Sequence, residues 1–120
     1  MLLNLNVNIF SNFIEMMSVE RAATQNTLTS YRHDLNNLSR YLNRKKLLLE
    51  KVENASMREF FREISKSGAT SSSLARHMST IRQFYKFLFQ ENIITDNPMN
   101  GIEGPKLGRT LPKLLSESSI

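Results

Sequence analysis

The sequence predicts an all-α protein with four helices, and three observations support this fold class. Apolar residues recur at helical spacing in four stretches, and residues suited to helix caps stand at several of their ends. No stretch alternates apolar and polar residues as a strand does. With 120 residues, 40% of them apolar, the chain suits one modest core. We expect a helical domain over residues 1–102 and a linker to a further domain over 103–120.

The first two predicted helices follow from apolar stripes. The first runs from about Ile9 to Arg21, with apolar residues at i, i+3, i+4 and i+7. The second runs from about Gln25 to Arg44, and the hydroxyl of Thr24 is expected to cap it by accepting a free N–H. The two stripes are Phe10, Phe13, Ile14 and Met17, and then Leu28, Tyr31, Leu35, Leu38 and Leu42.

The third helix follows a connector from Lys45 to Ala55. It is expected to begin with a capping box, in which Ser56 and Glu59 each satisfy a free backbone N–H. Gly68 is expected to end it with a positive φ, which glycine adopts without strain. The connector is expected to close the core with Leu47, Leu48, Leu49 and Val52, and the helix with Met57, Phe60, Phe61 and Ile64.

The fourth predicted helix starts within residues 70–73, where each residue can act as an N-cap, and continues to about Gln90. Its apolar face consists of Leu74, Met78, Ile81, Tyr85 and Leu88. Pro98 keeps the chain from continuing as helix, and residues 99–102 are expected to form a short turn. Glycines, prolines and cations from Glu103 onward indicate a linker, and residues 114–120 suggest the start of another helix.

Several kinds of function are disfavoured by composition. The chain has no cysteine, which excludes disulfides and thiolate metal sites. The histidines, His33 and His77, lie on different helices without acidic ligands at metal spacing, and Asp34 is expected to point away from them. We therefore expect no metal and no cofactor. The N-terminus lacks the features of a signal peptide, and no run approaches the ~20 apolar residues that span a bilayer, so a soluble, cytoplasmic protein without membrane contact is expected.

The polar faces of the second and fourth predicted helices point to double-stranded DNA as a partner. No acid occurs from Thr70 to Gln90, and Asp34 is the single acid on the second helix, in a chain of net charge +5. Such faces suit phosphates and base edges, although they also fit ordinary solvated surfaces. Arg76 would be the best base reader. The residues expected to hold phosphates near free N–H groups at helix starts are Thr27, Ser72 and Ser73.

Three blocks, in order, resemble the N-terminal domain of the tyrosine recombinases, or phage integrases. Residues 26–35, NTLTSYRHDL, resemble the signature of its second helix, and residues 74–88, LARHMSTIRQFYKFL, resemble its fourth. Asn97-Pro98, followed by GPK at 104–106 and LPK at 111–113, resembles the passage into the catalytic domain. Met78 stands where leucine is usual. Among these enzymes the Xer recombinases, particularly XerD-like ones, are the most similar.

The resemblance implies a four-helix SAM-like domain that forms half of a C-shaped clamp on DNA. The N-terminal halves of its second and fourth helices would face the major groove, and cations of the linker would lie against phosphates. The expected DNA-binding residues, with Gln83 added from the helical wheel, are Thr27, Thr29, Ser30, His33, Ser72, Ser73, Arg76, Thr80, Gln83, Lys106 and Arg109.

The resemblance also bears on activity. The catalytic residues of the family belong to its C-terminal domain, so none is expected here, and the chain should bind DNA without cutting it. The full-length protein would act at a dif-like site with a XerC-like partner to resolve chromosome dimers. A SAM-like module for protein–protein interaction is the alternative. An independent helix-turn-helix regulator is disfavoured because the connector after the second helix is longer than a tight turn.

Overall fold

The computed structural model describes residues 2–104 as an assembly of helices without a strand. The predicted all-α fold class and the count of four α-helices are therefore confirmed. None of the helices in this range is long and apolar enough to cross a membrane. The elements are α1 (Leu2–Glu20), α2 (Gln25–Lys45), the short 3-10 helix η1 (Leu49–Lys51), α3 (Asn54–Lys66) and α4 (Ser71–Gln90).

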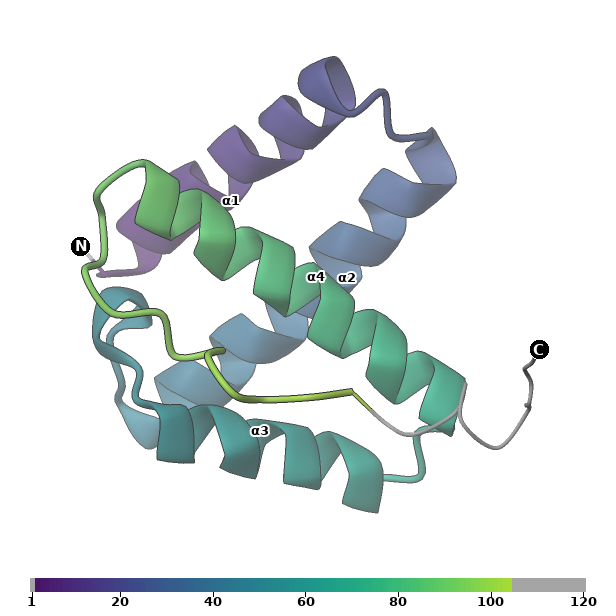
Figure 1. The fold of residues 1–120 in the computed structure, drawn as a ribbon, viewed down its shortest axis with the longest axis vertical. Helices are drawn as coiled ribbons and strands as arrows, with labels where there is room; N and C mark the ends of the chain where they lie inside the picture. The colour runs from purple at the N-terminus through teal and green to yellow at the C-terminus, as the bar shows by residue number, and fades with distance from the viewer. Residues whose placement is uncertain (1, 105–120) are drawn as a thin grey trace, which may run out of the picture.

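The helices pack around one crossing (Figure 1). α1 packs against α2, α2 against α4, and α3 against α4. α2 and α4 cross near their middles, and the N-terminal half of each lies on the same side of that crossing. The two helix faces that the sequence singles out for DNA therefore belong to one region of the molecule.

Helix α1 begins earlier than predicted, at Leu2 instead of Ile9. Its core side chains, Phe13, Ile14 and Met17, are buried as the stripe predicts. The ring of Phe13 lies edge-on to that of Phe84, with centroids 5.4 Å apart. This contact joins α1 to α4, and Phe84 is a core residue that the predicted apolar face of α4 did not include.

Two threonines cap the helices that carry the polar faces. The Thr24 hydroxyl accepts a hydrogen bond from the N–H of Thr27, as predicted for α2. The Thr70 hydroxyl accepts one from the N–H of Ser73, so Thr70 is the residue that caps α4. Both caps satisfy a first-turn N–H that has no partner inside the helix.

The predicted capping box of α3 is wrong. The helix begins at Asn54, two residues before Ser56, and its N-cap Glu53 makes no side-chain cap bond. Glu59 instead accepts a hydrogen bond from the hydroxyl of Tyr41, which also donates to the carbonyl of Ser56. Gly68 follows the helix with φ +99°, which confirms the positive φ predicted there.

The connector closes the core only in part. Leu49 is fully buried and Val52 is buried, but Leu48 is 37% exposed, contrary to the prediction. η1 forms in this stretch, and it turns Leu49 inward while Leu48 precedes it in extended backbone. Three consecutive leucines cannot all face one core, because neighbouring residues in a turn or helix point in different directions.

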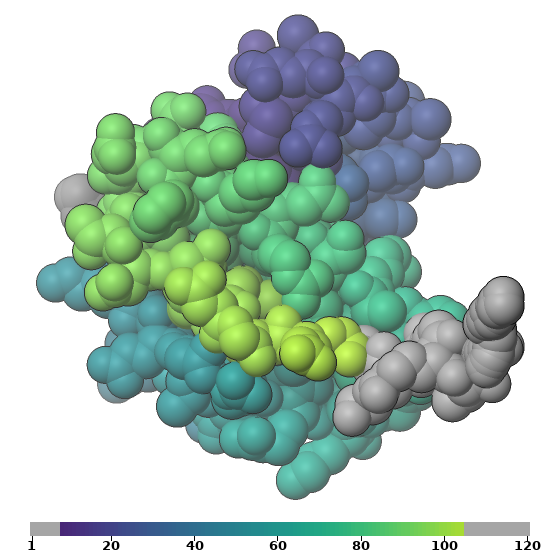
Figure 2. All heavy atoms as spheres, in the orientation of Figure 1, coloured from purple at the N-terminus to yellow at the C-terminus, as the bar shows by residue number. Residues whose placement is uncertain are grey.

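The segment after α4 runs across α3 and α4, as Figure 2 shows for the yellow-green atoms. Asn54 of α3 donates hydrogen bonds to the carbonyls of Pro98 and Asn100, and Arg82 of α4 donates to that of Ile102. The short turn predicted over residues 99–102 is present as a turn over residues 98–101. The segment that contains this turn therefore binds both helices through its backbone carbonyls.

Candidate nucleic-acid interface

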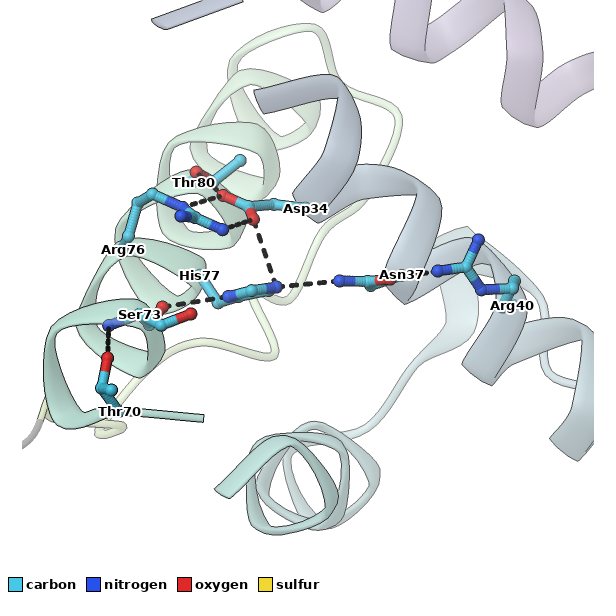
Figure 3. A network of polar contacts seen from close by, with 8 residues as sticks. All are labelled: Asp34, Asn37, Arg40, Thr70, Ser73, Arg76, His77 and Thr80. Carbon is cyan, nitrogen blue, oxygen red and sulfur yellow. Dashed lines mark hydrogen bonds and ion pairs between the residues drawn. The ribbon is translucent and has the colours of Figure 1, made fainter. Parts of the chain in front are cut away.

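The crossing of α2 and α4 is built on a buried acid. Asp34 of α2 is 0% exposed and accepts three hydrogen bonds, all of them from α4 (Figure 3). The Arg76 guanidinium donates twice, from Nη2 to Oδ1 over 2.8 Å and from Nε to Oδ2 over 3.3 Å. The Thr80 hydroxyl donates to Oδ2 over 2.7 Å. A buried carboxylate needs such partners, because it has lost its water.

Thr80 was expected to contact DNA, and the structure contradicts this. Its side chain is 0% exposed, and its hydroxyl is committed to Asp34. The helical wheel placed Thr80 beside the apolar stripe, where a neighbouring helix can cover it. α2 does cover it, so Thr80 belongs to the helix–helix contact and not to the surface.

His77 also departs from its expected surroundings. The sequence suggested no carboxylate partner for either histidine, but His77 Nε2 lies 3.2 Å from Asp34 Oδ1. The ring is buried, and Nδ1 lies 3.0 Å from the carbonyl oxygen of Ser73 in the preceding turn. Asp34 does not point away from His77, because its helix meets α4 at this residue.

A chain of polar side chains continues from His77 along α2 (Figure 3). Arg40 donates a hydrogen bond from Nη2 to Asn37 Oδ1, and arginine can only donate. The amide nitrogen of Asn37 therefore faces His77 Nε2, 3.0 Å away, and donates to it. Of the two ring nitrogens of His77, Nδ1 therefore faces the Ser73 carbonyl, and Nε2 faces both the Asn37 amide and the Asp34 carboxylate.

Arg76 is both anchored and accessible. Its side chain is 43% exposed, although the carboxylate that it binds is fully buried. The hydrogen bonds that Arg76 donates to Asp34 raise the pKa of Arg76 above its ordinary value, so the guanidinium is charged at all physiological pH values. Asp34 takes two of the five N–H groups of the guanidinium, and three remain for a ligand.

The α2 candidates lie on its N-terminal half at different depths. Thr29 and His33 are exposed, and Ser30 is half-buried. Thr27 is half-buried, and its hydroxyl oxygen accepts a hydrogen bond from Thr24. The N–H of Thr27 is used by the cap, so it is not one of the free N–H groups that could assist a phosphate at this helix start.

The candidate residues on α4 also differ in their exposure. Ser72 is exposed in the first turn, whereas Ser73 is half-buried. The N–H of Ser73 donates to the Thr70 hydroxyl, so it is not one of the free N–H groups that could assist a phosphate at the start of α4. Gln83 is half-buried in a hollow that it lines with Met17 and other residues of α1, three residues beyond Thr80. Lys106 and Arg109 lie outside the described residues.

The exposed charge on the two crossing helices is entirely positive. Asp34 is the single acid within α2 and α4, and it is buried and paired with Arg76. Exposed cations on these helices are Arg32, Arg40, Arg44, Lys45, Arg76, Arg82 and Lys86. Apart from Arg44 and Lys45, which pair with acids of α3, they make no ion pair with an exposed acid in the described part of the chain. An anionic ligand would meet no exposed carboxylate on these helices.

Comparison with known proteins identifies the family. The family model described as phage integrase, N-terminal SAM-like domain, matches residues 10–92. The chain belongs to this family. It is 42% identical over 108 residues to the tyrosine recombinase XerD of Rhizobium meliloti, across 90% of this chain and 35% of that protein. It is 38% identical over 109 residues to the XerD of Agrobacterium fabrum, across 91% of this chain and 33% of that protein.

The XerD of Caulobacter vibrioides is similar to the same extent, with 39% identity over 108 residues. The chain thus spans about a third of the length of these relatives. No solved structure matches it significantly. The resemblance noted in the sequence blocks is confirmed at the level of the phage integrase N-terminal SAM-like domain and of the tyrosine recombinases.

Sequence reasoning missed one feature of the candidate interface, which is the pair of hydrogen bonds between Arg76 and Asp34. Arg76 and Thr80 are four residues apart on α4, so both can reach one acid from another helix. Asp34 was the one acid on a face otherwise free of acids, and this was a usable signal. An isolated acid on such a face is either exposed or paired across a helix contact, and only the packing decides between them.

Proposed function

We propose that this chain is the DNA-binding N-terminal domain of a XerD-like, site-specific tyrosine recombinase. One observation carries the proposal beyond family membership. The polar faces of the two crossing helices expose cations and hydrogen-bonding groups, while their single carboxylate is buried and neutralised by Arg76. Neutralisation of phosphates by such cations supplies much of the affinity of DNA-binding proteins.

In this proposal the N-terminal halves of α2 and α4 enter or straddle the major groove. Thr29, Ser30 and His33 would contact DNA from α2, and Ser72 and Arg76 from α4. Ser73 and Thr27 would contribute side-chain hydroxyls at most, because caps use their N–H groups. Gln83 would lie at the edge of the interface beside α1. Lys106 and Arg109 of the linker would lie against phosphates.

The proposed role of the whole protein goes further. It would act at a dif-like recombination site in chromosome dimer resolution or DNA integration, together with a XerC-like subunit. The described tyrosines are poor nucleophile candidates. Tyr85 is fully buried and donates to the carbonyl of Leu49, and Tyr41 donates to Glu59 and Ser56. Tyr31 packs against Phe13. We therefore propose that this chain binds DNA without cutting it.

A salt titration of DNA binding tests the proposal. Fluorescence anisotropy would compare a duplex carrying dif-like inverted repeats with a scrambled duplex of equal length and composition. Tighter binding to the repeats, with affinity that falls steeply as salt rises, is the expected result. Equal binding to both duplexes would mean that a generic basic surface binds DNA without sequence preference. No binding at low salt would reject the DNA interface and favour the protein-interaction module.

A pair of matched variants tests where the DNA lies. Ser72→Glu places a carboxylate in the first turn of α4, where the helix dipole tolerates it, so the fold should survive. Thr95→Glu makes a similar change at an exposed residue beyond the C-terminal end of α4. We expect Ser72→Glu to weaken DNA binding at least about tenfold more than Thr95→Glu, because a local charge acts more strongly than a distant, screened one. Equal effects would argue against the proposed face.

A further inference from the structure

A buried acid at the centre of a DNA-binding surface is costly and needs an explanation. Asp34 is 0% exposed, and it lies where α2 packs against α4. An apolar residue at such a position would often give equal or better stability than a buried ion pair. Its negative charge also opposes the binding of phosphates. These two costs suggest that Asp34 has a role other than stabilising the packing of α2 against α4.

The geometry of the ion pair shows what Asp34 controls. Its two oxygens bind Nε and Nη2 of Arg76, which form one edge of the planar guanidinium. The adjacent edge, formed by Nη1 and the second N–H of Nη2, makes no hydrogen bond within residues 2–104. Two parallel N–H groups on that edge match the O6 and N7 acceptors of guanine. The 43% exposure of the side chain leaves it open to a ligand.

We infer that Asp34 is a positioning residue for base recognition, which holds one edge of Arg76 so that the other edge is presented to a guanine. The inference rests on the proposed DNA-binding function. Arginine is long and flexible, and an unheld side chain loses more conformational freedom on binding and can reach several acceptors. An arginine held at two points before DNA arrives loses less freedom and recognises one base pair more strictly.

This role predicts opposite changes in two measured quantities. Asp34→Asn keeps the volume but removes the charge and one of the two acceptor atoms. Affinity for scrambled DNA should stay the same or rise, because a negative charge leaves the interface. Preference for guanine at one position of the preferred site should fall about tenfold, which is within the discrimination that a bidentate arginine–guanine pair supplies. If Asp34 had a purely structural role, Asp34→Asn would instead lower both the affinity for scrambled DNA and the preference for guanine.

Selection of bound duplexes from a randomised library, followed by sequencing, would measure base preference at every position. The 120-residue chain would be compared with Asp34→Asn, and Glu63→Gln serves as the matched control. Glu63 also pairs with an arginine of α2, Arg44, but at the surface, so its neutralisation should leave every base preference unchanged. In the Arg76→Lys background, Asp34→Asn should cause no further loss at the guanine position, because the two changes act on one interaction.

A measurement on the unmodified chain covers the case in which Asp34→Asn does not fold. The 15N relaxation of Arg76 Nε in the free protein should show an order parameter near the ~0.85 of rigid backbone. Arg32, an exposed arginine of α2, is the internal control and should be mobile. A mobile Arg76 side chain in the free protein would overturn the inference.

The outcomes separate this inference from the function on which it rests. If the unmodified chain selects no sequence, the proposed specific DNA binding fails, and the role of Asp34 fails with it. If the unmodified chain selects a site and Asp34→Asn selects the same site with the same guanine preference, the inference alone fails. Loss of preference at one position, with an ordered Arg76 in the free protein, supports it.

Discussion

The hydroxyl of Tyr85 donates a hydrogen bond to the carbonyl oxygen of Leu49 over 2.8 Å, and both residues are 0% exposed. The bond joins α4 to η1, a three-residue helix that makes few regular backbone bonds of its own. A buried carbonyl in such a segment needs a partner from elsewhere in the chain. Burial also raises the pKa of Tyr85 far above its ordinary value, so the hydroxyl keeps its proton.

Replacing this tyrosine should weaken the fold. Tyr85→Phe leaves the Leu49 carbonyl buried without a partner, and we expect the free energy of unfolding to fall by about 1–3 kcal/mol. Urea unfolding followed by circular dichroism measures it. The control is Tyr31→Phe, because the half-buried Tyr31 hydroxyl has no hydrogen bond to the described residues. Equal losses in the two variants would contradict the importance of the Leu49 bond.

Phe13 should be among the most sensitive positions of the core. Its ring is 0% exposed and packs against Phe84, Phe87 and Tyr31, so it joins α1 to both crossing helices. Phe13→Ala should cost about 3–5 kcal/mol of unfolding free energy through lost burial and a cavity. Thermal unfolding measures the change. Phe89→Ala, at a ring that is 49% exposed, should cost well under half as much; similar losses would mean that α1 is not part of the core.

Glu59 should contribute to the acid sensitivity of the fold. The Tyr41 hydroxyl donates to its carboxylate over 2.5 Å and lowers the pKa of Glu59 below its ordinary value of 4.5. A carboxyl group whose pKa is lowered by folding stabilises the protein above its unfolded pKa. That contribution is lost as the pH falls through the folded pKa.

The Glu59→Gln variant should therefore lose less stability than the unmodified chain when the pH falls from 7 to 3. Urea midpoints at the two pH values measure this difference. Glu15→Gln, at an exposed position of α1, is the control for the general loss of one carboxylate. An acid-induced loss in Glu59→Gln as large as in the unmodified chain would show that the bond to Tyr41 does not persist in solution.

Arg76 should matter for stability as well as for DNA. Arg76→Ala leaves the buried Asp34 carboxylate with the Thr80 hydroxyl as its one remaining hydrogen-bond donor, and we expect a loss of about 1–3 kcal/mol. Arg76→Lys keeps a cation near Asp34 and should recover part of that loss. Arg32→Ala, at an exposed arginine on α2, should change stability little. DNA-binding losses in Arg76→Ala must accordingly be compared at temperatures where the variant is folded.

Much of the fold followed from the sequence because it depends on residues close together in the chain. Apolar spacing predicted all four α-helices, and Thr24 and Gly68 act at their ends as expected from local backbone chemistry. The limits of the helices were less accurate. α3 begins at Asn54, two residues earlier than the predicted cap, and Glu59, needed for the predicted capping box, bonds to Tyr41 of another helix.

In the candidate site, too, some features could be predicted from the sequence and others could not. Helical periodicity alone placed Thr29, His33 and Ser72 on the surface, and the structure finds them exposed. Periodicity also placed Thr80 within reach of DNA, but α2 covers it. A helical wheel shows which residues share a face, but it does not show where another helix crosses that face.

The sequence by itself determined the family, the helical fold and the absence of acids on the exposed faces of α2 and α4, since all of these are properties of residue type and spacing. Only the tertiary structure decided what the one remaining acid does. Asp34 lies 42 positions from Arg76 in the chain, and their hydrogen bonds exist because α2 and α4 cross at these two residues. Contacts between helices depend on packing, which local periodicity does not encode.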